Sequence, residues 1–424
     1  MTNLISDTSA EFSWPAEGVT RVPYRVYTDP AIYAREQEKI YRGPTWNYLA
    51  LEAELPEPGD YKTTFVGDAP IVVTRAADGS LNAFVNRCAH RGAAVCVDAY
   101  GHSKNKIFTC VYHAWVYDLK GDLKGLPFKT GINGVGGMPP DFKLSEHSLQ
   151  KLKVDTFSGL IFGSFDPGVA PLADYLGEKM GSYIKRVFNR PIRILGFNRQ
   201  LMQNNWKLYF ENNKDPYHAS LLHLFFATFG LNRLSQKGGV DLDETGMHHV
   251  SYTYGALGEN ESAYKDADIR SFQSQYRLAD PSLLNGKQEF ADGISLTIQS
   301  IFPSLVIQQI YNTLAVRQLL PKGPEQCELL WTYFGYGDDD DAMTNIRLKQ
   351  SNLVGPAGYV SLEDGGVGER VQKGIVRGDQ EKCSFIEMGG KDVHSQAFRA
   401  TETSVRGFWK EYCNLMGFST GLMK

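Results

Sequence analysis

Two short motifs in the first third of the chain pair a cysteine with a histidine. Cys88 and His90 are separated by one residue, and nineteen residues further on Cys110 and His113 are separated by two. Thiolate sulfur and neutral imidazole nitrogen are both good metal ligands. The chain of 424 residues has only six cysteines, too few for a disulfide framework, so the two motifs indicate a metal centre.

Two kinds of metal centre use cysteine and histidine together in this number. One is a tetrahedral zinc site, but zinc fingers generally pair cysteine with cysteine and histidine with histidine. The other is a Rieske [2Fe-2S] cluster, in which two cysteines hold one iron and two histidines hold the second. Each motif supplies one ligand of each type, which favours the Rieske cluster. Neutral imidazole makes such a cluster less negative and raises its reduction potential, which suits a group that accepts an electron and passes it on.

A second set of candidate ligands lies in the stretch NNWKLYFENNKDPYHASLLH, residues 204–223. His218 and His223 are five residues apart, about 500° around a helical wheel, and a slightly distorted helix could bring both to one ion. A distant carboxylate would complete a 2-His-1-carboxylate triad, the ligand set of mononuclear non-haem Fe(II) that leaves positions open for O2. Asp364 is the best candidate for it, and the neighbouring Glu363 is the alternative. A histidine pair on an apolar helix is also compatible with a structural role.

The elements that would position these residues change in type near residue 165. Residues 48–165 contain short β-branched and aromatic runs between turn signals, which predict an all-β module. The later part combines helical spacing, as in LADYLGEKMGSYIKRVF, with a strand-rich middle. We therefore predict an α+β protein. Its expected parts are an N-terminal segment (1–44) packing on the catalytic part, an all-β Rieske [2Fe-2S] domain (45–165) and an α+β catalytic iron domain (166–424) with an antiparallel sheet and helices carrying the iron ligands.

The composition limits the possible partners. The formal net charge of -4 includes no basic excess that would attract nucleic acid or anionic lipid. No apolar run approaches the roughly 20 residues of a membrane span, and the first residues lack the basic and apolar regions of a signal peptide. We expect a cytoplasmic protein that binds neither nucleic acid nor membrane.

Four motifs together carry a resemblance to a known family: CAHRG (88–92), CVYHAW (110–115), NWKLYFENNKDPYHASLLH (205–223) and GPAGYVSLEDG (355–365). Over nearly its whole length the chain resembles the large (alpha) subunit of the Rieske non-haem iron aromatic-ring hydroxylating oxygenases. The resemblance implies two ligand sets, namely Cys88, His90, Cys110 and His113 for the cluster and His218, His223 and Asp364 for the catalytic iron. The spacing of nineteen is slightly longer than is usual in the family, which implies a longer loop.

The resemblance also implies roles for two further residues and a set of partners. Asp215 would hydrogen-bond a cluster histidine of the neighbouring subunit and carry the electron to the iron, and Asn212 would lie near the iron. The expected cofactors are the [2Fe-2S] cluster and Fe(II), with O2 as co-substrate and NAD(P)H supplying electrons through a ferredoxin or reductase partner. A small beta subunit and an alpha3 or alpha3beta3 oligomer are also expected.

Within the family, the stretches LNRLSQKGG, HHVSYTYG, AVRQLLPKG and TETSVRGFWK resemble the branch that acts on benzoate-type acids. A buried substrate carboxylate requires a cation, preferably a bidentate arginine. Arg317 matches a carboxylate-binding arginine of the terephthalate enzymes, and Arg399 matches a second. Ser251 and Ile298 are further pocket candidates, and the expected wall also includes Leu222 and Phe302.

Several functions remain open on the sequence alone. The favoured one is dihydroxylation of anthranilate, giving catechol, or of another ortho-substituted benzoate. Terephthalate 1,2-dioxygenation is the close alternative, followed by salicylate hydroxylation and by a Rieske monooxygenase that demethylates a methoxyarene. The alternative from another class is an electron-transfer or zinc-binding protein without catalysis.

Overall fold

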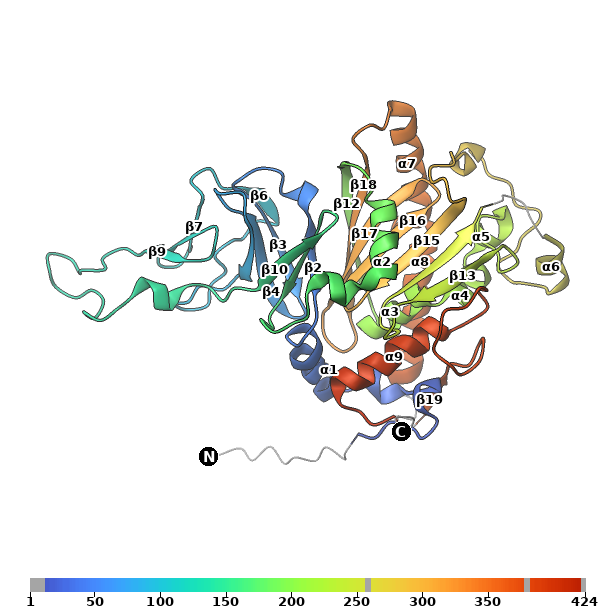
Figure 1. The fold of residues 1–424 in the computed structure, drawn as a ribbon, viewed down its shortest axis with the longest axis horizontal. Helices are drawn as coiled ribbons and strands as arrows, with labels where there is room; N and C mark the ends of the chain where they lie inside the picture. The colour runs from blue at the N-terminus through green and yellow to red at the C-terminus, as the bar shows by residue number, and fades with distance from the viewer. Residues whose placement is uncertain (1–11, 256–260, 377–381, 421–424) are drawn as a thin grey trace.

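The computed structural model describes residues 12–255, 261–376 and 382–420, which form two bodies side by side (Figure 1). The smaller body is built from short β-sheets of the first part of the chain. The larger one is built around a single long sheet with helices on both faces. This arrangement confirms the predicted α+β class, with an all-β part preceding a mixed part.

Three small antiparallel sheets form the smaller body. Their strand orders are β10-β11-β2, β5-β4-β3-β6 and β7-β8-β9. The strands run as β2 Asn47–Leu51, β3 Asp60–Val66, β4 Ala69–Arg75, β5 Leu81–Val85, β6 Tyr100–His102, β7 Ile107–Thr109, β8 Val116–Asp118, β9 Leu123–Gly125, β10 Lys153–Phe157 and β11 Leu160–Ser164. The CAHRG motif follows β5, and CVYHAW is the loop of the β7–β8 hairpin, so a turn presents each motif.

One seven-stranded antiparallel sheet forms the centre of the larger body, in the order β12-β18-β17-β16-β15-β14-β13. Its strands are β12 Ile192–Met202, β13 Gly238–Leu242, β14 His249–Tyr254, β15 Ile294–Ile301, β16 Leu305–Ile310, β17 Thr313–Pro321 and β18 Cys327–Tyr336. A separate two-stranded pair joins β1 (Arg21–Pro23) to β19 (Cys383–Phe385).

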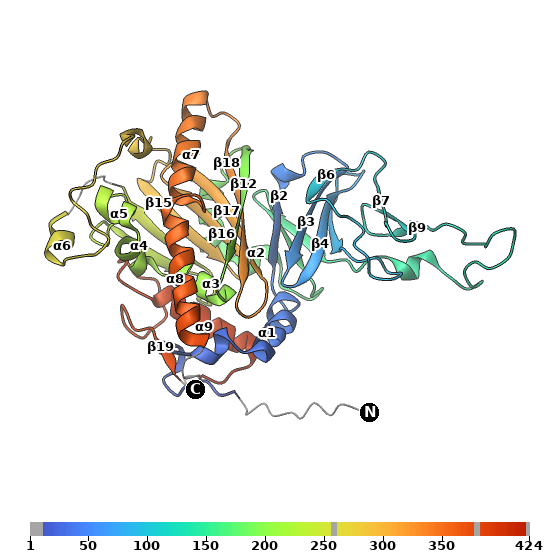
Figure 2. The same cartoon turned by 180° about the vertical axis from the view of Figure 1, so that it is seen from behind.

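Helices cover the two faces of this sheet (Figures 1 and 2). On one face α2 buries Leu176 and Ile184 against Ile307 and Val316 of the sheet. On the other lie α7 and α8, which Figure 2 shows as a long column in front of the strands. The helices are α1 Pro30–Glu36, α2 Leu172–Val187, α3 Trp206–Lys214, α4 Pro216–Leu222, α5 Leu224–Phe229, α6 Glu261–Asp266, α7 Asp341–Val354, α8 Tyr359–Val376 and α9 Thr403–Met416.

The alternation of side chains along the strands determines which residues can form a site. Val316 faces the α2 core, so its neighbour Arg317 points to the opposite face. On that face the register places Ser251 opposite Ile298, and Ile298 opposite Gln308. Polar groups from adjacent strands therefore meet under the helices that carry the candidate iron ligands.

The N-terminal segment contacts the larger body through a buried ion pair. Glu36, the last residue of α1, accepts a hydrogen bond from Lys207 Nζ at 2.6 Å, and both side chains are fully buried. Trp206 Nε1 and Tyr412 Oη also donate to Glu36. These contacts tie α1 to α3 and α9. A search of the described residues for a helix long and apolar enough to cross a membrane finds none.

Candidate metal centres and substrate pocket

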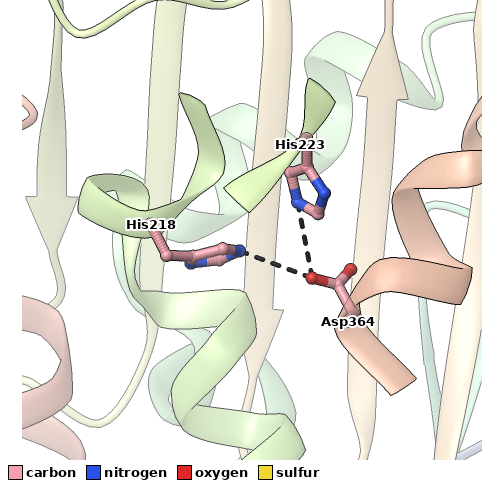
Figure 3. Close-up of side chains that lie close together, drawn as sticks. All are labelled: His218, His223 and Asp364. Atoms are coloured by element: carbon pink, nitrogen blue, oxygen red, sulfur yellow. Dashed lines mark ion pairs between the residues drawn. The ribbon is translucent and has the colours of Figure 1, made fainter. Parts of the chain in front are cut away.

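Three predicted ligands converge on one point between α4, α5 and α8 (Figure 3). The Nε2 atoms of His218 and His223 lie 3.5 and 3.4 Å from the same oxygen, Oδ1 of Asp364. One possible ligand atom from each residue lies within 4.8 Å of those of the other two. Two imidazole nitrogens and one carboxylate oxygen in this arrangement fit the facial triad of a mononuclear Fe(II).

The prediction of one continuous helix through both histidines is wrong. Helix α4 ends at Leu222, His223 has extended backbone angles (φ -81°, ψ 103°), and α5 begins at Leu224. The reason is geometric, because a spacing of five residues leaves the two side chains about 140° apart on a regular helix. The break at His223 reorients its ring toward His218 and Asp364.

Glu363 contacts the ligand set from outside. Its Oε2 lies 2.8 Å from Nδ1 of His223, the ring nitrogen turned away from Asp364. A proton on Nδ1 leaves Nε2 free to bind a metal ion, as carboxylate partners of metal-binding histidines do elsewhere. This geometry distinguishes the two acidic neighbours that the sequence left open, with Asp364 facing the shared point and Glu363 orienting a histidine.

Asp364 is held as an anion. Burial acts to raise the pKa of its carboxyl group, but His223, His218 and the amide of Asn212 act in the opposite direction and hold the pKa at about 2. Asn212 Nδ2 donates to Asp364 Oδ1 at 3.0 Å. An ionised carboxylate between two imidazoles is a suitable environment for a divalent cation.

Asp215 caps the helix that carries His218. Its Oδ1 accepts hydrogen bonds from the backbone N–H groups of Tyr217 (2.7 Å) and His218 (3.3 Å). Its Oδ2 lies 3.3 Å from Nδ1 of the His218 ring. The side chain therefore contacts the iron site and remains about one-fifth exposed.

The other predicted ligand set occupies the two turns of the smaller body. Cys88 and Cys110 are free thiols buried in its core, whereas His90 and His113 are exposed at its surface with ring centroids 4.5 Å apart. Two buried sulfurs and two adjacent surface imidazoles fit a Rieske cluster, with cysteines toward the core and histidines toward solvent.

A cavity beside the triad brings together most of the predicted pocket residues. Its lining includes Ser251, Ile298, Arg317 and Arg399, together with Asn212, Asp215 and all three members of the triad. Leu222 lines a second cavity, which shares His218 and Asp364 with the first, so its place in the pocket wall stays a prediction. The expectation for Phe302 was wrong, because this side chain packs in the core against Trp206 and Phe210.

Both arginines of the cavity are buried without a carboxylate partner among the described residues. Arg317 donates to Tyr209 Oη (3.0 Å), Asn213 Oδ1 (2.8 Å) and Gln308, and its guanidinium stacks on Trp331. Arg399 donates through Nη1 to Asn232, and its Nε and Nη2 have no hydrogen-bond partner in the described part of the chain. Burial lowers the pKa of Arg399 to about 10, which leaves it charged at neutral pH.

The sequence alone did not indicate several residues that line this pocket or contact its arginines. Asn232 and Gln308 accept hydrogen bonds from the two guanidinium groups, and the buried hydroxyl of Thr253 has no hydrogen-bond partner among the residues that the structure describes. Strand alternation could have placed Thr253 on the face of Ser251, and Gln308 follows from the strand register. Asn232 lies in a loop, and no periodic signal indicates it.

Two family models cover most of the chain. Residues 45–136 match the Rieske [2Fe-2S] domain, and residues 185–417 match the catalytic domain of the ring-hydroxylating alpha subunit. An iron-sulfur domain joined to a domain with a mononuclear iron site defines an oxygenase with two metal centres. The chain belongs to the alpha subunits of the Rieske ring-hydroxylating oxygenases, and the cofactors of this class are the [2Fe-2S] cluster and a mononuclear iron.

Three curated relatives are similar over nearly their whole length. The chain is 54% identical to the alpha 2 subunit of the terminal oxygenase component of terephthalate 1,2-dioxygenase from Comamonas sp. (95% of this chain, 97% of the relative). It is 49% identical to the large subunit of anthranilate 1,2-dioxygenase from Burkholderia cepacia (97% of each). It is 42% identical to the large oxygenase component of salicylate 5-hydroxylase from Ralstonia sp. (95% and 96%).

The fold is similar to that of a solved enzyme. Naphthalene 1,2-dioxygenase from Rhodococcus sp., in a crystal structure with bound indole, superposes with a TM-score of 0.77. The alignment covers 93% of this chain and 94% of the other at 23% identity. At this identity the likeness concerns the fold and carries no statement about the substrate.

Proposed function

We propose that the protein is the terminal oxygenase subunit that dihydroxylates an aromatic carboxylate, and that a ring bearing two carboxylates, such as terephthalate, is its substrate. One observation carries the proposal. Two buried arginines, Arg317 and Arg399, line one cavity with the iron triad, and neither forms an ion pair within the described part of the chain. When bound, the iron supplies oxygen activation, with electrons that the cluster delivers.

The energetic reason is the desolvation of charge. A buried charge without a counterion costs several kcal/mol, and hydrogen bonds to neutral groups offset only part of that cost. Tyr209 and Asn213 satisfy part of the Arg317 fork, and Asn232 satisfies one nitrogen of Arg399. A substrate carboxylate at each arginine would supply the missing negative charge and hold the ring beside the iron ligands.

The second arginine favours the dicarboxylate over anthranilate. The amino group of anthranilate requires a hydrogen-bond acceptor, whereas Arg399 offers only donors. Anthranilate, the substrate that the sequence favoured, remains the second candidate. The same cavity offers acceptors for its amino group, namely Asn232 Oδ1 and the hydroxyls of Ser251 and Thr253. The two most similar relatives described above carry the same two substrates in their names.

We also propose the four cluster ligands and the three iron ligands in the roles given above, with Asp215 as the link between centres of neighbouring subunits. The β7–β8 hairpin carries Cys110 and His113. In both views β7 lies in the smaller body, and α4 lies on the side of the larger body away from it (Figures 1 and 2). The exposed imidazoles and the partly exposed Asp215 carboxylate could meet only between copies. An alpha3 or alpha3beta3 oligomer, a small beta subunit and a ferredoxin or reductase that draws on NAD(P)H belong to this proposal.

A single-turnover assay tests the function without knowledge of the electron donor. The holoenzyme is reduced chemically in the absence of oxygen and then mixed with 18O2 and one compound from a panel of terephthalate, anthranilate, benzoate, salicylate and naphthalene. We expect a dihydrodiol of terephthalate that contains two 18O atoms, identified by mass. Conversion of anthranilate to catechol with little terephthalate product would support the second candidate. Equal conversion of naphthalene would contradict the carboxylate proposal.

A further inference from the structure

The second cavity, which Leu222 lines, also reaches the iron ligands. It lies between α3, α8, β19 and the start of α9, and it shares His218 and Asp364 with the substrate cavity. Its volume is about 340 Å³. Phe385 and Val371 in its wall are 65% and 41% exposed, so the cavity also reaches the surface of the subunit. It therefore joins the surface to the iron site by a path separate from the substrate cavity.

Dihydroxylation of a ring consumes protons as well as electrons. O2 takes up two electrons from the reductase route and two protons, the O–O bond breaks, and two C–O bonds form on the ring. Each oxygen atom ends as a hydroxyl group and so requires one proton. A substrate that fills its cavity excludes water from it. The protein must therefore let protons reach the iron site by another way.

The groups that line the substrate cavity are poorly suited to supply these protons. Both arginines hold their protons at neutral pH. The proposed iron ligands offer atoms that carry no proton when they bind a metal ion. Among the described lining residues the remaining carboxylate is Asp215, which accepts two backbone N–H groups of α4 and contacts the His218 ring.

The second cavity contains two carboxyl groups outside the proposed ligand sets, those of Glu211 and Glu402. Glu211 lies on α3, and its Oε1 accepts hydrogen bonds from Tyr27 Oη at 2.7 Å and from Trp409 Nε1. These two donors fix the carboxyl group in place. They leave Oε2, which no described residue hydrogen-bonds, to carry a proton or to contact water.

The surroundings of Glu211 suit proton transfer at neutral pH. Burial raises the pKa of its carboxyl group, and the charge of Glu402 acts in the same direction. Hydrogen bonds from Tyr27 and Trp409 and the charge of Lys207 act against this, and the resulting pKa is about 7. An acid whose pKa lies near the working pH is the most effective in passing a proton on.

Glu402 is the second acid of the cavity and precedes α9. Its Oε2 accepts the backbone N–H of Met388 at 2.9 Å. Burial raises the pKa of its carboxyl group, and Asp215 acts in the same direction, whereas the backbone groups of Met388 and Glu387 and the Arg406 cation oppose the rise. Glu402 therefore holds a proton more readily than an exposed glutamate does.

We propose that Glu211 and Glu402 relay protons from the subunit surface through the second cavity to the iron site during oxygenation. A proton held by these carboxyl groups passes to an oxygen atom that becomes a hydroxyl group, and the carboxylate left behind is protonated again from solvent. A polar cavity of this size can hold the water molecules that join the steps. Interfaces between subunits also hold water, so the proposed ring of copies leaves the route open. The inference rests on the proposed oxygenase function but not on the identity of the acid.

The test compares the wild-type holoenzyme with Glu211→Gln, which keeps the shape and the accepting oxygen of the side chain but has no acidic proton. Each protein is reduced chemically, loaded with the substrate that the wild type converts, and mixed with 18O2 over a range of pH. Product formation by the wild type should slow as the pH rises through about 7, because Glu211 then loses its proton. Glu211→Gln should be about 100-fold slower at neutral pH, the lower end of what a positioned acid contributes, and should lack this inflection.

Two further variants separate a relay from a structural role. Glu411→Gln is the matched control, because Glu411 lies on α9 and burial raises the pKa of its carboxyl group, but it does not line the cavity. Its rate and pH profile should equal those of the wild type. Tyr27→Phe removes a hydrogen bond that lowers the pKa of Glu211, so the fall in rate should move to higher pH. An inflection that stays in place would contradict the proposal.

Infrared spectroscopy of the holoenzyme during a pH titration gives a readout without turnover. A protonated carboxyl band that disappears as the pH rises through about 7 should be present in the wild type and in Glu411→Gln, and absent from Glu211→Gln. Iron and sulfide analysis verifies that each variant holds both metal centres, and if Glu211→Gln loses one, Tyr27→Phe decides the question. A fully loaded Glu211→Gln enzyme with the wild-type rate and pH profile would overturn the relay. A wild type that converts no compound of the panel would instead contradict the proposed function.

Discussion

At the scale of single residues, the neighbouring acidic residues Glu363 and Asp364 of α8 have different roles at the proposed metal site. Asp364 faces the two Nε2 atoms, while Glu363 hydrogen-bonds the opposite nitrogen of His223. A partner of this second kind fixes the tautomer and the orientation of the ligand ring. The geometry therefore predicts a measurable effect on iron binding from a residue that does not touch the iron.

Glu363→Gln should weaken the binding of the mononuclear iron by about 10- to 100-fold, because the amide holds the His223 N–H less strongly than a carboxylate does. Iron affinity is measured by competition with a chelator, and the EPR signal of the Rieske cluster should be unchanged. Glu369→Gln is the control, since Glu369 lies on the same helix and pairs with Lys373 at the surface. Wild-type iron affinity in Glu363→Gln would show that the contact does not support the site.

Arg399 permits a prediction about specificity. Arg399→Met should lower kcat/KM for terephthalate by about two to four orders of magnitude, as expected for the loss of about 3 to 5 kcal/mol from a buried charge pair. Turnover of benzoate, with a single carboxylate held at Arg317, should change little. The thermal midpoint of the free enzyme should not fall, because the substitution removes an uncompensated buried charge. Equal losses of kcat/KM for terephthalate and benzoate would mean that Arg399 does not bind a second carboxylate.

At the scale of secondary structure, the sequence predicted the elements well and the local geometry poorly. The β-branched runs between turn signals, such as IVVTR, correspond to strands, and LADYLGEKMGSYIKRVF contains α2. The break at His223 was not predicted, because its neighbours Leu222 and Leu224 favour a helix and only the convergence on Asp364 requires the turn. The proposed domain boundary after residue 165 falls between β11 and α2 and stays a prediction.

The sequence predicted only those residues of the candidate site that belong to recognisable motifs. His218 and Asp364 are far apart in the chain, and the chemistry of a 2-His-1-carboxylate ligand set together with the family resemblance, not periodicity, pointed to Asp364. The role of Glu363 depends on atoms brought together by the fold, which no spacing rule supplies. Strand alternation placed Arg317 on a face, but the sequence could not show that its hydrogen-bond partners are all neutral.

The buried pair that joins α1 to α3 gives a prediction about stability. Lys207→Met leaves the Glu36 carboxylate buried without a counterion and should lower the free energy of unfolding by about 3 to 5 kcal/mol. The double variant with Glu36→Gln should recover part of the loss, since it contains no buried charge at this position. Arg42→Met, which removes the partly exposed partner of Glu38 and Asp68, should cost at most about 1 kcal/mol. Urea unfolding of the four proteins measures these differences, and equal effects of Lys207→Met and Arg42→Met would contradict the argument.

At the scale of the whole molecule, the two metal centres are presented on different surfaces. The histidines of the cluster motifs are exposed, and the Asp215 carboxylate beside the iron site is partly exposed. In Figures 1 and 2 strand β7 of the cluster hairpin lies in the smaller body, and helix α4 lies on the side of the larger body away from it. In the head-to-tail ring of copies that we propose, the one surface would lie against the other in every interface, so that each copy would both give and receive an electron.

This arrangement predicts complementation between two inactive variants. His113→Ala disables the cluster and His218→Ala disables the iron site, so neither protein alone should turn over substrate. If electrons pass between copies, co-expression should restore activity, because some interfaces then join an intact cluster to an intact iron site. At equal mixing about a quarter of the interfaces of a closed ring satisfy this condition. Activity near that fraction, lost again when Asp215→Ala is added to the His113→Ala copy, would support the route through Asp215. Mixed oligomers with complete cofactors in the unmutated sites but no activity would mean that each chain carries its electron internally.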